Sequence, residues 1–421
     1  MLRWLEWHLT PARCRRAAYL LLLGDALLLP VACDAADLSW MPEADVKMRA
    51  YDNVRWSASN PEAAWGTEGG GGVDLKAASD TWSSELHPHA NLRRFMIGKN
   101  LDADEYSVAF NNGLHLERLT SDVKFRYSHD STLVSETTTA GLRNDITDRD
   151  TIDIHPTLRY LINDLTSAEV GFLYNDVTFA NPGNAGLIDY SYMQASFTLT
   201  RVIDPVSSVF LQPYVSDFRT PQVGGGTRSY GGQVGYARRF SETLDANVAV
   251  GFVSSDIDFL TPTLTILPNP VPHFAVINVK DTAGSDGPIV GLTINKKFSN
   301  DTATFEYSRQ VSPSARGSQS QADHIRLGLH HPFSPRFWVS VSGIYDMRNA
   351  EGNRLVADLN RDQAEMNASI GYRLTEQLTF ETFYRYVWAS IPVNSTTLDV
   401  NTLFVGIRYS GGPRPVLGGT W

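Results

Sequence analysis

Histidine pairs are the side chains of this 421-residue chain whose type and spacing come closest to metal or enzyme chemistry. His87 and His89 stand two apart in LHPHAN, so on a strand both would face one side. His324 and His330 also share a face. Such a pair could bind a metal ion, although it more often lines a polar wall. The motifs GxSxG, HExxH, GxxxxGKS/T and CxxC do not occur in the chain. The sequence therefore predicts no catalytic residue, no cofactor and no metal, and the protein is not expected to be an enzyme.

Charged side chains that recur on one face of alternating segments are the stronger functional candidates. If the apolar faces of these segments meet lipid, the opposite faces enclose a water-filled lumen. Opposed charges across a narrow lumen orient polar solutes and disfavour apolar ones. The alternative is that these charges pair with one another and seal the space. The predicted lumen-lining residues are Arg49, Lys124, Arg126, Arg159, Glu306, Arg326, Glu365, Arg373, Glu381, Arg385 and Arg408, and further charges expected on the same faces include Lys47, Arg93, Asp122, Asp153 and Asp346.

Strands with a period of two residues are the elements that must position these side chains. In LTFETFYRYVW (378–388), Leu378, Tyr384 and Trp388 share one face, and Glu381 and Arg385 share the other. The same alternation runs through 122–130, 337–348 and 363–373. A soluble β-sandwich alternates in the same way with its apolar face inward, so alternation alone does not distinguish the two folds.

Short polar breaks divide the alternating segments. Ser241-Glu242-Thr243 is one such break, and FSND (298–301), FSPR (333–336) and LTEQ (374–377) have the same form. Longer polar connections, such as 134–150 and 347–360, lie between them. This order is typical of an up-and-down transmembrane barrel with short periplasmic turns and longer external loops. We expect an all-β, antiparallel barrel of about 18 strands, the first at 44–58. Sixteen is the alternative, because the first three segments are weakly patterned.

Three features favour a membrane barrel over a sandwich. The expected strands are about 12–16 residues long, whereas strands in soluble sheets are usually much shorter. Aromatic residues gather near strand ends, which suits the girdles at the two bilayer surfaces. The third feature is an N-terminal export signal. These aromatic residues are Trp56, Trp82, Tyr106, Phe240, Trp338, Tyr386, Trp388 and Tyr409.

The export signal is predicted over residues 1–36. Three arginines (13, 15 and 16) precede the apolar run 17–32, and small residues follow it. A buried N-terminal helix is the alternative for this segment. Both cysteines, Cys14 and Cys33, lie in this segment, so residues 37–421 would contain neither a disulfide nor a thiolate site. The formal net charge of −10 argues against a nucleic-acid partner.

The stretch MRAYDNVRWSA (48–58) and the train of hairpins with Ser/Thr turns resemble the β-barrel porin 2 family of Gram-negative bacteria, often encoded beside exopolysaccharide genes. The resemblance spans about 40–410. It implies a place in the outer membrane, in contact with lipid and lipopolysaccharide and inserted by the barrel-assembly machinery. It also implies passage of saccharide. Barrels of this class end on an aromatic residue, for which Tyr409 and Trp421 are both candidates.

The predicted function is passage of a polar solute, such as a saccharide or exopolysaccharide, through an outer-membrane barrel of residues 37–421. The alternative is a structural or surface-interaction barrel without an open pore. In that case the segment 259–281, predicted to form a projecting hairpin with a proline-rich tip, would be the contact point.

Overall fold

The computed structural model describes residues 37–98, 101–132, 146–181, 187–267, 273–314, 318–349, 360–391, 396–412 and 414–415. For residues 259–280, the description is confined to the backbone. The predicted export segment, residues 1–36, lies outside the described residues. No helix in the described ranges has the length and apolar character needed to cross a membrane.

The described chain is built from strands. Their bounds are β1 Asp37–Tyr51, β2 Ala64–Ala78, β3 Trp82–Ile97, β4 Ala103–His115, β5 Leu119–Ser131, β6 Asp148–Asn163, β7 Thr166–Phe179, β8 Tyr190–Asp204, β9 Ser207–Thr220, β10 Gly225–Ser241, β11 Leu244–Leu267, β12 His273–Lys297, β13 Thr302–Ser314, β14 Ser318–Pro332, β15 Phe337–Asn349, β16 Arg361–Arg373, β17 Leu378–Ile391, β18 Thr396–Ser410 and the two-residue β19 Arg414–Pro415.

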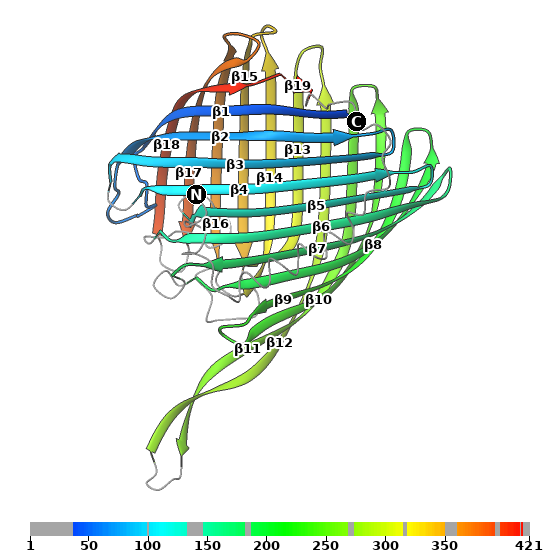
Figure 1. The fold of residues 1–421 in the computed structure, drawn as a ribbon. Coiled ribbons are helices and arrows are strands. Elements are labelled where there is room, and N and C mark those ends of the chain that lie inside the picture. Colours follow the sequence, from blue (N-terminus) through cyan, green and yellow to red (C-terminus); the bar gives the residue numbers. More distant parts are fainter. Residues whose placement is uncertain are drawn as a thin grey trace, which may run out of the picture.

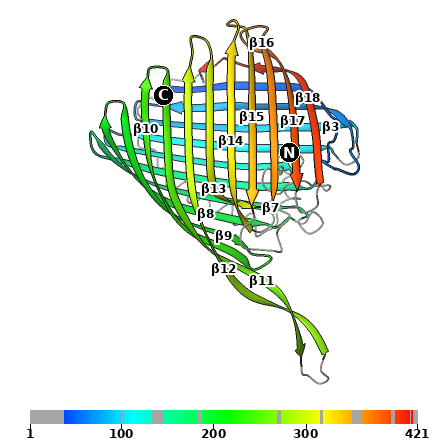
Figure 2. The ribbon, with the colours of Figure 1, turned by 180° about the vertical axis from the view of Figure 1, so that it is seen from behind.

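Each strand from β1 to β18 pairs antiparallel with its neighbours in the sequence, and the first strand closes the sheet on the last. The β1–β18 ladder runs from Glu43↔Ser410 to Tyr51↔Thr402, and β19 continues the pairing to Ser39 and Trp40. Figures 1 and 2 show the resulting barrel from opposite sides. The prediction of an all-β, antiparallel up-and-down barrel with 18 strands is therefore confirmed.

The bounds of the first strand are the main error in the sequence prediction of the strands. This strand was expected at 44–58 but spans Asp37–Tyr51. It ends there because the Asn53 side chain accepts a hydrogen bond from the main-chain N–H of Ser57, and such a local bond favours a turn over a strand. The weakly patterned glycines at 69–72 do lie in a strand, β2, where they pair with both β1 and β3.

The connections alternate between the two ends of the barrel, and most follow the predicted order of short turns and longer loops, although 221–224 between β9 and β10 is also short. Eight turns of two to four residues lie at the end of the barrel that also contains Asp37 and Ser410, which we call the short-turn end. The other connections lie at the opposite end, the long-loop end. One of the connections at the long-loop end is the segment 52–63, which joins β1 to β2 and lies within the described residues.

The tightest short turns share one construction. Oδ1 of Asn163, Oδ1 of Asp204 and Oγ of Ser241 each accept a hydrogen bond from the main-chain N–H two residues on, at 2.8–3.3 Å. A β-bulge precedes each of these residues. The side-chain acceptor supplies the turn without a positive φ, so these turns need no glycine. This explains why the polar breaks begin with Ser, Thr, Asn or Asp.

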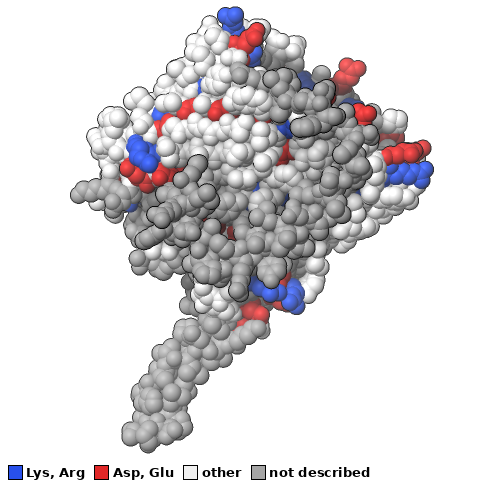
Figure 3. All heavy atoms as spheres, viewed as in Figure 1, with Lys and Arg blue, Asp and Glu red and all other residues white. Residues whose placement is uncertain are grey.

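The outer face carries the exposed apolar side chains. They recur at every second residue, as in Val46 and Met48 on β1, Val248 and Val250 on β11, and Leu327 and Leu329 on β14. In the view of Figure 3 most of the described surface is uncharged, and the larger groups of charged side chains lie toward its edges. An apolar band with polar edges suits a bilayer.

Two of the aromatic residues assigned to girdles lie on the inner face instead. Trp56 is buried against β17 and β18, and Trp338 lies against Gly371 of β16. Alternation could not place Trp56, because it lies in a loop rather than in a strand. Trp82, Tyr106, Phe240, Tyr386, Trp388 and Tyr409 fall on the outward side of their strands.

The longest hairpin projects from the long-loop end. β11 and β12 pair from Leu244↔Lys296 to Leu267↔His273, whereas β12 pairs with β13 only from Val290 to Lys297. Figures 1 and 2 show both strands running past the other strand ends and away from the barrel. The projecting hairpin is therefore present as predicted, and its proline-rich tip (268–272) lies outside the described residues.

Candidate functional site on the inner wall

The inner face is the side of each strand opposite the exposed apolar residues. On β1, for example, Asp45, Lys47 and Arg49 alternate with outward Val46 and Met48. All eleven predicted lumen-lining residues lie on this face of their strands, so alternation placed each of them on the charged side. Their role in solute passage is a separate question.

Five of the eleven residues make ion pairs across neighbouring strands. Arg49 Nε lies 2.7 Å from Glu68 Oε2 on β2, and Arg408 Nη2 lies 3.1 Å from Glu381 Oε2 on β17. Arg385 of β17 pairs with Glu365 of β16. These side chains compensate one another, so this part of the inner wall is close to neutral.

The side chains of the other six make no ion pair or hydrogen bond with any described residue. Five of them are basic and exposed on the inner face. Glu306 is half-buried, and although it stands opposite Arg326 in the β13–β14 register, no contact joins them. The unpaired and exposed members of the predicted set are thus all basic: Lys124, Arg126, Arg159, Arg326 and Arg373.

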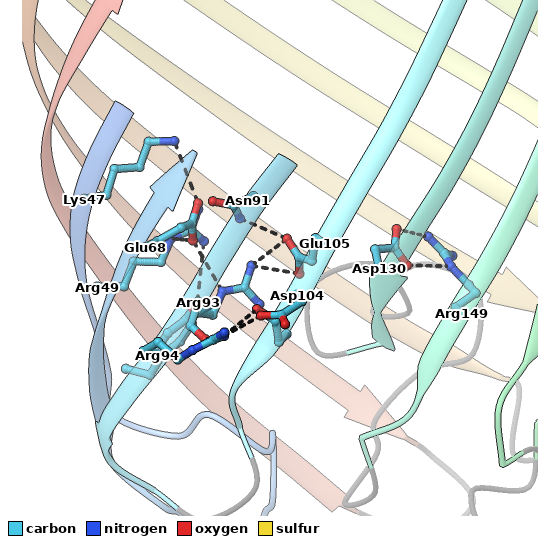
Figure 4. A network of polar contacts seen from close by, with 12 residues as sticks. Lys47, Arg49, Glu68, Asn91, Arg93, Arg94, Asp104, Glu105, Asp130 and Arg149 are labelled. Carbon is cyan, nitrogen blue, oxygen red and sulfur yellow. Dashed lines mark hydrogen bonds and ion pairs between the residues drawn. The ribbon is translucent and has the colours of Figure 1, made fainter. Parts of the chain in front are cut away.

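A compact charge network covers the inner faces of β1 to β4 (Figure 4). Its centre is Glu68, whose side chain is only 4% exposed. Lys47 Nζ, Arg49 Nε and Arg93 Nε lie 3.8, 2.7 and 3.3 Å from the Glu68 carboxylate. Arg93 Nη2 also lies 3.0 Å from Glu105 Oε1. Three cations around one buried carboxylate hold four strands together at the closure of the barrel.

Four buried polar atoms of this network have no hydrogen-bond partner among the described residues: Nε of Arg49, Oδ1 of Asn91, Nη1 of Arg93 and Oε1 of Glu105. Arg49 Nε and Glu105 Oε1 still lie at ion-pair distance from Glu68 and Arg93, and Asn91 Nδ2 donates to Glu105 Oε2 at 3.1 Å. Figure 4 also draws Asp130 and Arg149 of the next strands, which pair at 2.8 Å. Toward the long-loop ends of β1 to β6 the inner wall therefore carries close pairs, whereas the unpaired Lys124, Arg126 and Arg159 lie further toward the short-turn end of β5 and β6.

The predicted histidine pair lies beside this network. The rings of His87 and His89 stack with centroids 6.1 Å apart. His87 Nδ1 contacts Asp74, and its Nε2 lies 3.4 Å from Glu43 Oε1. The inward positions of Gly70 and Gly72 leave room for the ring of His89, since a Cβ at either would lie 3.2–3.3 Å from it. This accounts for two of the four glycines, Gly70 and Gly72, that made β2 look like a poor strand.

The second predicted histidine pair is divided between two partners. His324 Nδ1 lies 2.7 Å from Asp346 Oδ1, and His330 Nδ1 lies 2.7 Å from Ser340 Oγ. In the part of the chain that the structure describes, no group of three or more His, Cys, Asp or Glu side chains is arranged to hold a metal ion.

Sequence reasoning did not single out Glu68 or Glu105, and it assigned Trp56 to an aromatic girdle. Glu68 stands among glycines, where alternation gives little signal. A search for inward acids opposite the inward bases Lys47 and Arg93 could have found it, but only with the strand register known. Trp56 could not be found by alternation at all, because its position depends on the path of a loop.

Comparison with known proteins finds likeness only in structure. No family model matches the chain, and no curated protein matches it. The ferric-catecholate import receptor Fiu of E. coli K12 aligns over 89% of this chain and 81% of its own, with a TM-score of 0.50 and 9% identity. Two other barrels align less well. OccAB4 of Acinetobacter baumannii covers 90% of this chain and 98% of its own (TM-score 0.47, 9% identity), and the outer membrane protein OprD of Pseudomonas aeruginosa covers 91% and 94% (TM-score 0.43, 10% identity).

At identities near 10% these likenesses concern the fold. The chain has the architecture of a closed outer-membrane-type barrel, in agreement with its strand pairing. The resemblance to the β-barrel porin 2 family that MRAYDNVRWSA suggested is not supported by a family match.

Proposed function

We propose that residues 37–421 form an outer-membrane barrel that lets small polar solutes pass, with anions favoured, and that it does so without covalent chemistry. The observation that carries the proposal is the set of five exposed, unpaired bases on the inner face. Basic side chains around a confined aqueous path raise the local concentration of anions. A barrel of 16–18 strands is wide enough to leave water inside.

The proposal includes an orientation and a route to the membrane. The short-turn end would face the periplasm and the long-loop end the outside, as in barrels of this kind. The exposed apolar faces would meet lipid and lipopolysaccharide, after removal of residues 1–36 and insertion by the barrel-assembly machinery. A saccharide, the solute implied by the family resemblance, would be a neutral member of the polar solutes admitted.

The test is ion selectivity in planar bilayers. Arg126→Glu combined with Arg326→Glu reverses two unpaired inner charges, so we expect the reversal potential in a KCl gradient to move toward cation preference. Arg118→Glu, an exposed residue in the short turn before β5, makes the same kind of charge change off the wall and should leave the potential unchanged. Liposome swelling with neutral sugars and with organic anions then measures which polar solutes enter.

Two results would contradict the proposal. A folded protein that never opens conductance steps is not a constitutive conduit. A reversal potential unmoved by the double substitution would show that Arg126 and Arg326 do not face the path of the ions.

A second function rests on the projecting β11–β12 hairpin. Its backbone pairing continues to Leu267↔His273, well beyond the last β12–β13 pair at Val290↔Arg309. Such an arm suits a surface contact with another molecule. A barrel that stays silent in bilayers but loses binding to the cell surface or to a partner when 259–281 is removed would favour this function.

A further inference from the structure

The segment 52–63 between β1 and β2 folds to the inside of the barrel. Trp56, only 9% exposed, packs on four residues at the long-loop ends of β17 and β18. Val387 and Ala389 alternate with outward Tyr386 and Trp388, so they share the inner face with Arg385. The indole therefore lies within the mouth of the barrel, not in a girdle. Its four contacts are Val387, Ala389, Leu398 and Val400.

Hydrogen bonds fix the start of this segment to the barrel wall. Asp52 accepts from the main-chain N–H of Asn401 at 2.7 Å and from its side-chain Nδ2 at 2.6 Å, while Asp52 N–H donates to the Asn401 carbonyl at 3.2 Å. The next residue, Asn53, accepts from Ser57 N–H at 3.0 Å and donates to the Ser57 carbonyl at 2.8 Å. The first bonds anchor the segment, and the second close the turn that carries Trp56.

Two further contacts hold the rest of the segment in shape. Arg55 Nε lies 2.7 Å from Glu62 Oε2, and the N–H of Val54 donates to the Glu62 carbonyl at 2.8 Å. Val54 itself is 1% exposed and packs with Ala64 and Leu101. Every residue of the stretch DNVRW (52–56) thus makes a contact that holds the segment in place.

Trp56 adopts a backbone conformation that bulky residues rarely adopt. Its φ is 54°, and no other non-glycine residue in the described chain has a positive φ. Such a conformation persists only where the surroundings determine it, and it clusters at functional sites. Here the apolar pocket on β17 and β18 and the turn closed by Asn53 determine it.

The indole also borders the charged wall. Arg385 Cζ lies 5.8 Å from the ring centroid of Trp56, and Arg385 is the residue that pairs with Glu365. The segment therefore brings an aromatic side chain to a polar pair on the inner face, at the long-loop end of the barrel.

From these contacts we propose that residues 52–63 form a selectivity loop, with Trp56 as the specificity-determining residue that limits the size of the solutes admitted at the long-loop mouth. The inference rests on the proposed conduit function. Without the indole, the loop loses its apolar contact with the β17–β18 pocket, and the mouth becomes wider.

The functional test compares Trp56→Ala with Trp65→Ala in planar bilayers and in liposome swelling. Trp65 stands on the outer face of β2 at the same end and serves as the matched control. We expect Trp56→Ala to raise the single-channel conductance and to admit larger sugars, whereas Trp65→Ala behaves like the unmodified protein. Trp56→Phe keeps an aromatic ring in the pocket and should also behave like the unmodified protein.

The position of the loop is tested separately from conduction. Residues 37–421 contain no cysteine, so Trp56→Cys with Val400→Cys introduces a single pair. A bifunctional methanethiosulfonate reagent, which bridges the space that the indole filled, should cross-link the folded barrel, shift its migration on gels and hold conductance low, and reduction of the two mixed disulfides should raise it. Heat-modifiable migration of each variant shows that it has folded.

The two proposals fail in different ways. A conducting protein that is indifferent to Trp56→Ala and to the cross-link overturns the role of the loop and leaves the conduit intact. If the cysteine pair does not cross-link in the folded barrel, residue 56 does not lie beside Val400, and the proposed position of the loop is wrong. If no variant gives conductance in planar bilayers, both the proposed conduit function and the selectivity role of Trp56 are wrong. The cross-link still reports where the loop lies.

Discussion

At the residue scale, the buried carboxylate of Glu68 compensates the charges of three basic side chains on the inner wall. Its neighbours Lys47, Arg49 and Arg93 come from two other strands, and its side chain is almost inaccessible. A buried ion pair gives modest net stability when complete, because desolvation offsets the attraction. Removal of one member is different, since it leaves buried charge without compensation.

We therefore expect Glu68→Ala to lower the free energy of unfolding by about 3–5 kcal/mol, the cost of breaking a buried pair. Glu85→Ala is the matched control, because Glu85 pairs with Lys76 at 2.6 Å while both are about half exposed. An exposed pair contributes about 0–1 kcal/mol. Urea unfolding of both variants in lipid vesicles gives the comparison, and equal losses would show that burial of Glu68 is unimportant.

At the scale of the element, packing between strand neighbours decides which inner positions need glycine. Gly371 of β16 stands opposite Trp338 of β15, and a Cβ at 371 would lie 2.1 Å from Cε2 of that indole. Gly328 of β14 also faces inward, yet a Cβ there would meet nothing within 4 Å. Two inner glycines in one barrel thus have opposite tolerance for a methyl group.

Gly371→Ala is expected to destabilise the barrel by about 1–3 kcal/mol, the usual cost of overpacking, because the Trp338 ring must move. Gly328→Ala should be close to neutral. Vesicle unfolding curves measure both. If Gly371→Ala proves as stable as Gly328→Ala, Trp338 does not occupy the space over residue 371.

The short turns give a second prediction for elements. Asn163→Ala removes the acceptor for Leu165 N–H, and we expect a loss of about 0.5–1.5 kcal/mol, the net value of one hydrogen bond. The adjacent Asp164 is exposed, so Asp164→Ala should have little effect. Loss of stability in the control but not in Asn163→Ala would mean that the side-chain bond does not shape the turn.

The whole molecule is defined by closure of β1 on β18, which leaves no sheet edge within the barrel. A membrane-spanning sheet needs this closure because unpaired main-chain groups cannot meet water in lipid. Closure also places Asp37 and Ser410 at the short-turn end, together with all eight short turns. Once the side of the membrane that one short turn faces is known, the side that every other turn and loop faces is known too.

A labelling experiment tests that orientation. Val223→Cys lies in the connection between β9 and β10 at the long-loop end, and Glu242→Cys lies in a short turn. With a membrane-impermeant maleimide we expect intact cells to label residue 223 and to leave residue 242 unlabelled. Permeabilised cells should label both. The opposite pattern in intact cells would reverse the orientation.

The sequence alone was enough for the repeating parts of the molecule. Alternation with a period of two placed Arg126, Arg326 and Arg385 on the inner face, because the pleat of a strand fixes the face of each residue. Polar breaks located the turns, because a side-chain acceptor such as that of Ser241 produces the turn locally. Eighteen strands and their order follow from these two signals.

Only the tertiary structure decided which of these charges are free. The face of a residue depends on its own strand, whereas its partner depends on the register with the neighbouring strand and on the path of the loops. Arg385 is paired with Glu365 and covered by Trp56, while Arg373 on the adjacent strand is unpaired and exposed. For the same reason the stretch DNVRW looked like part of a strand but forms the start of an inward loop, because Asp52 and Trp56 contact β17 and β18, more than three hundred residues away along the chain.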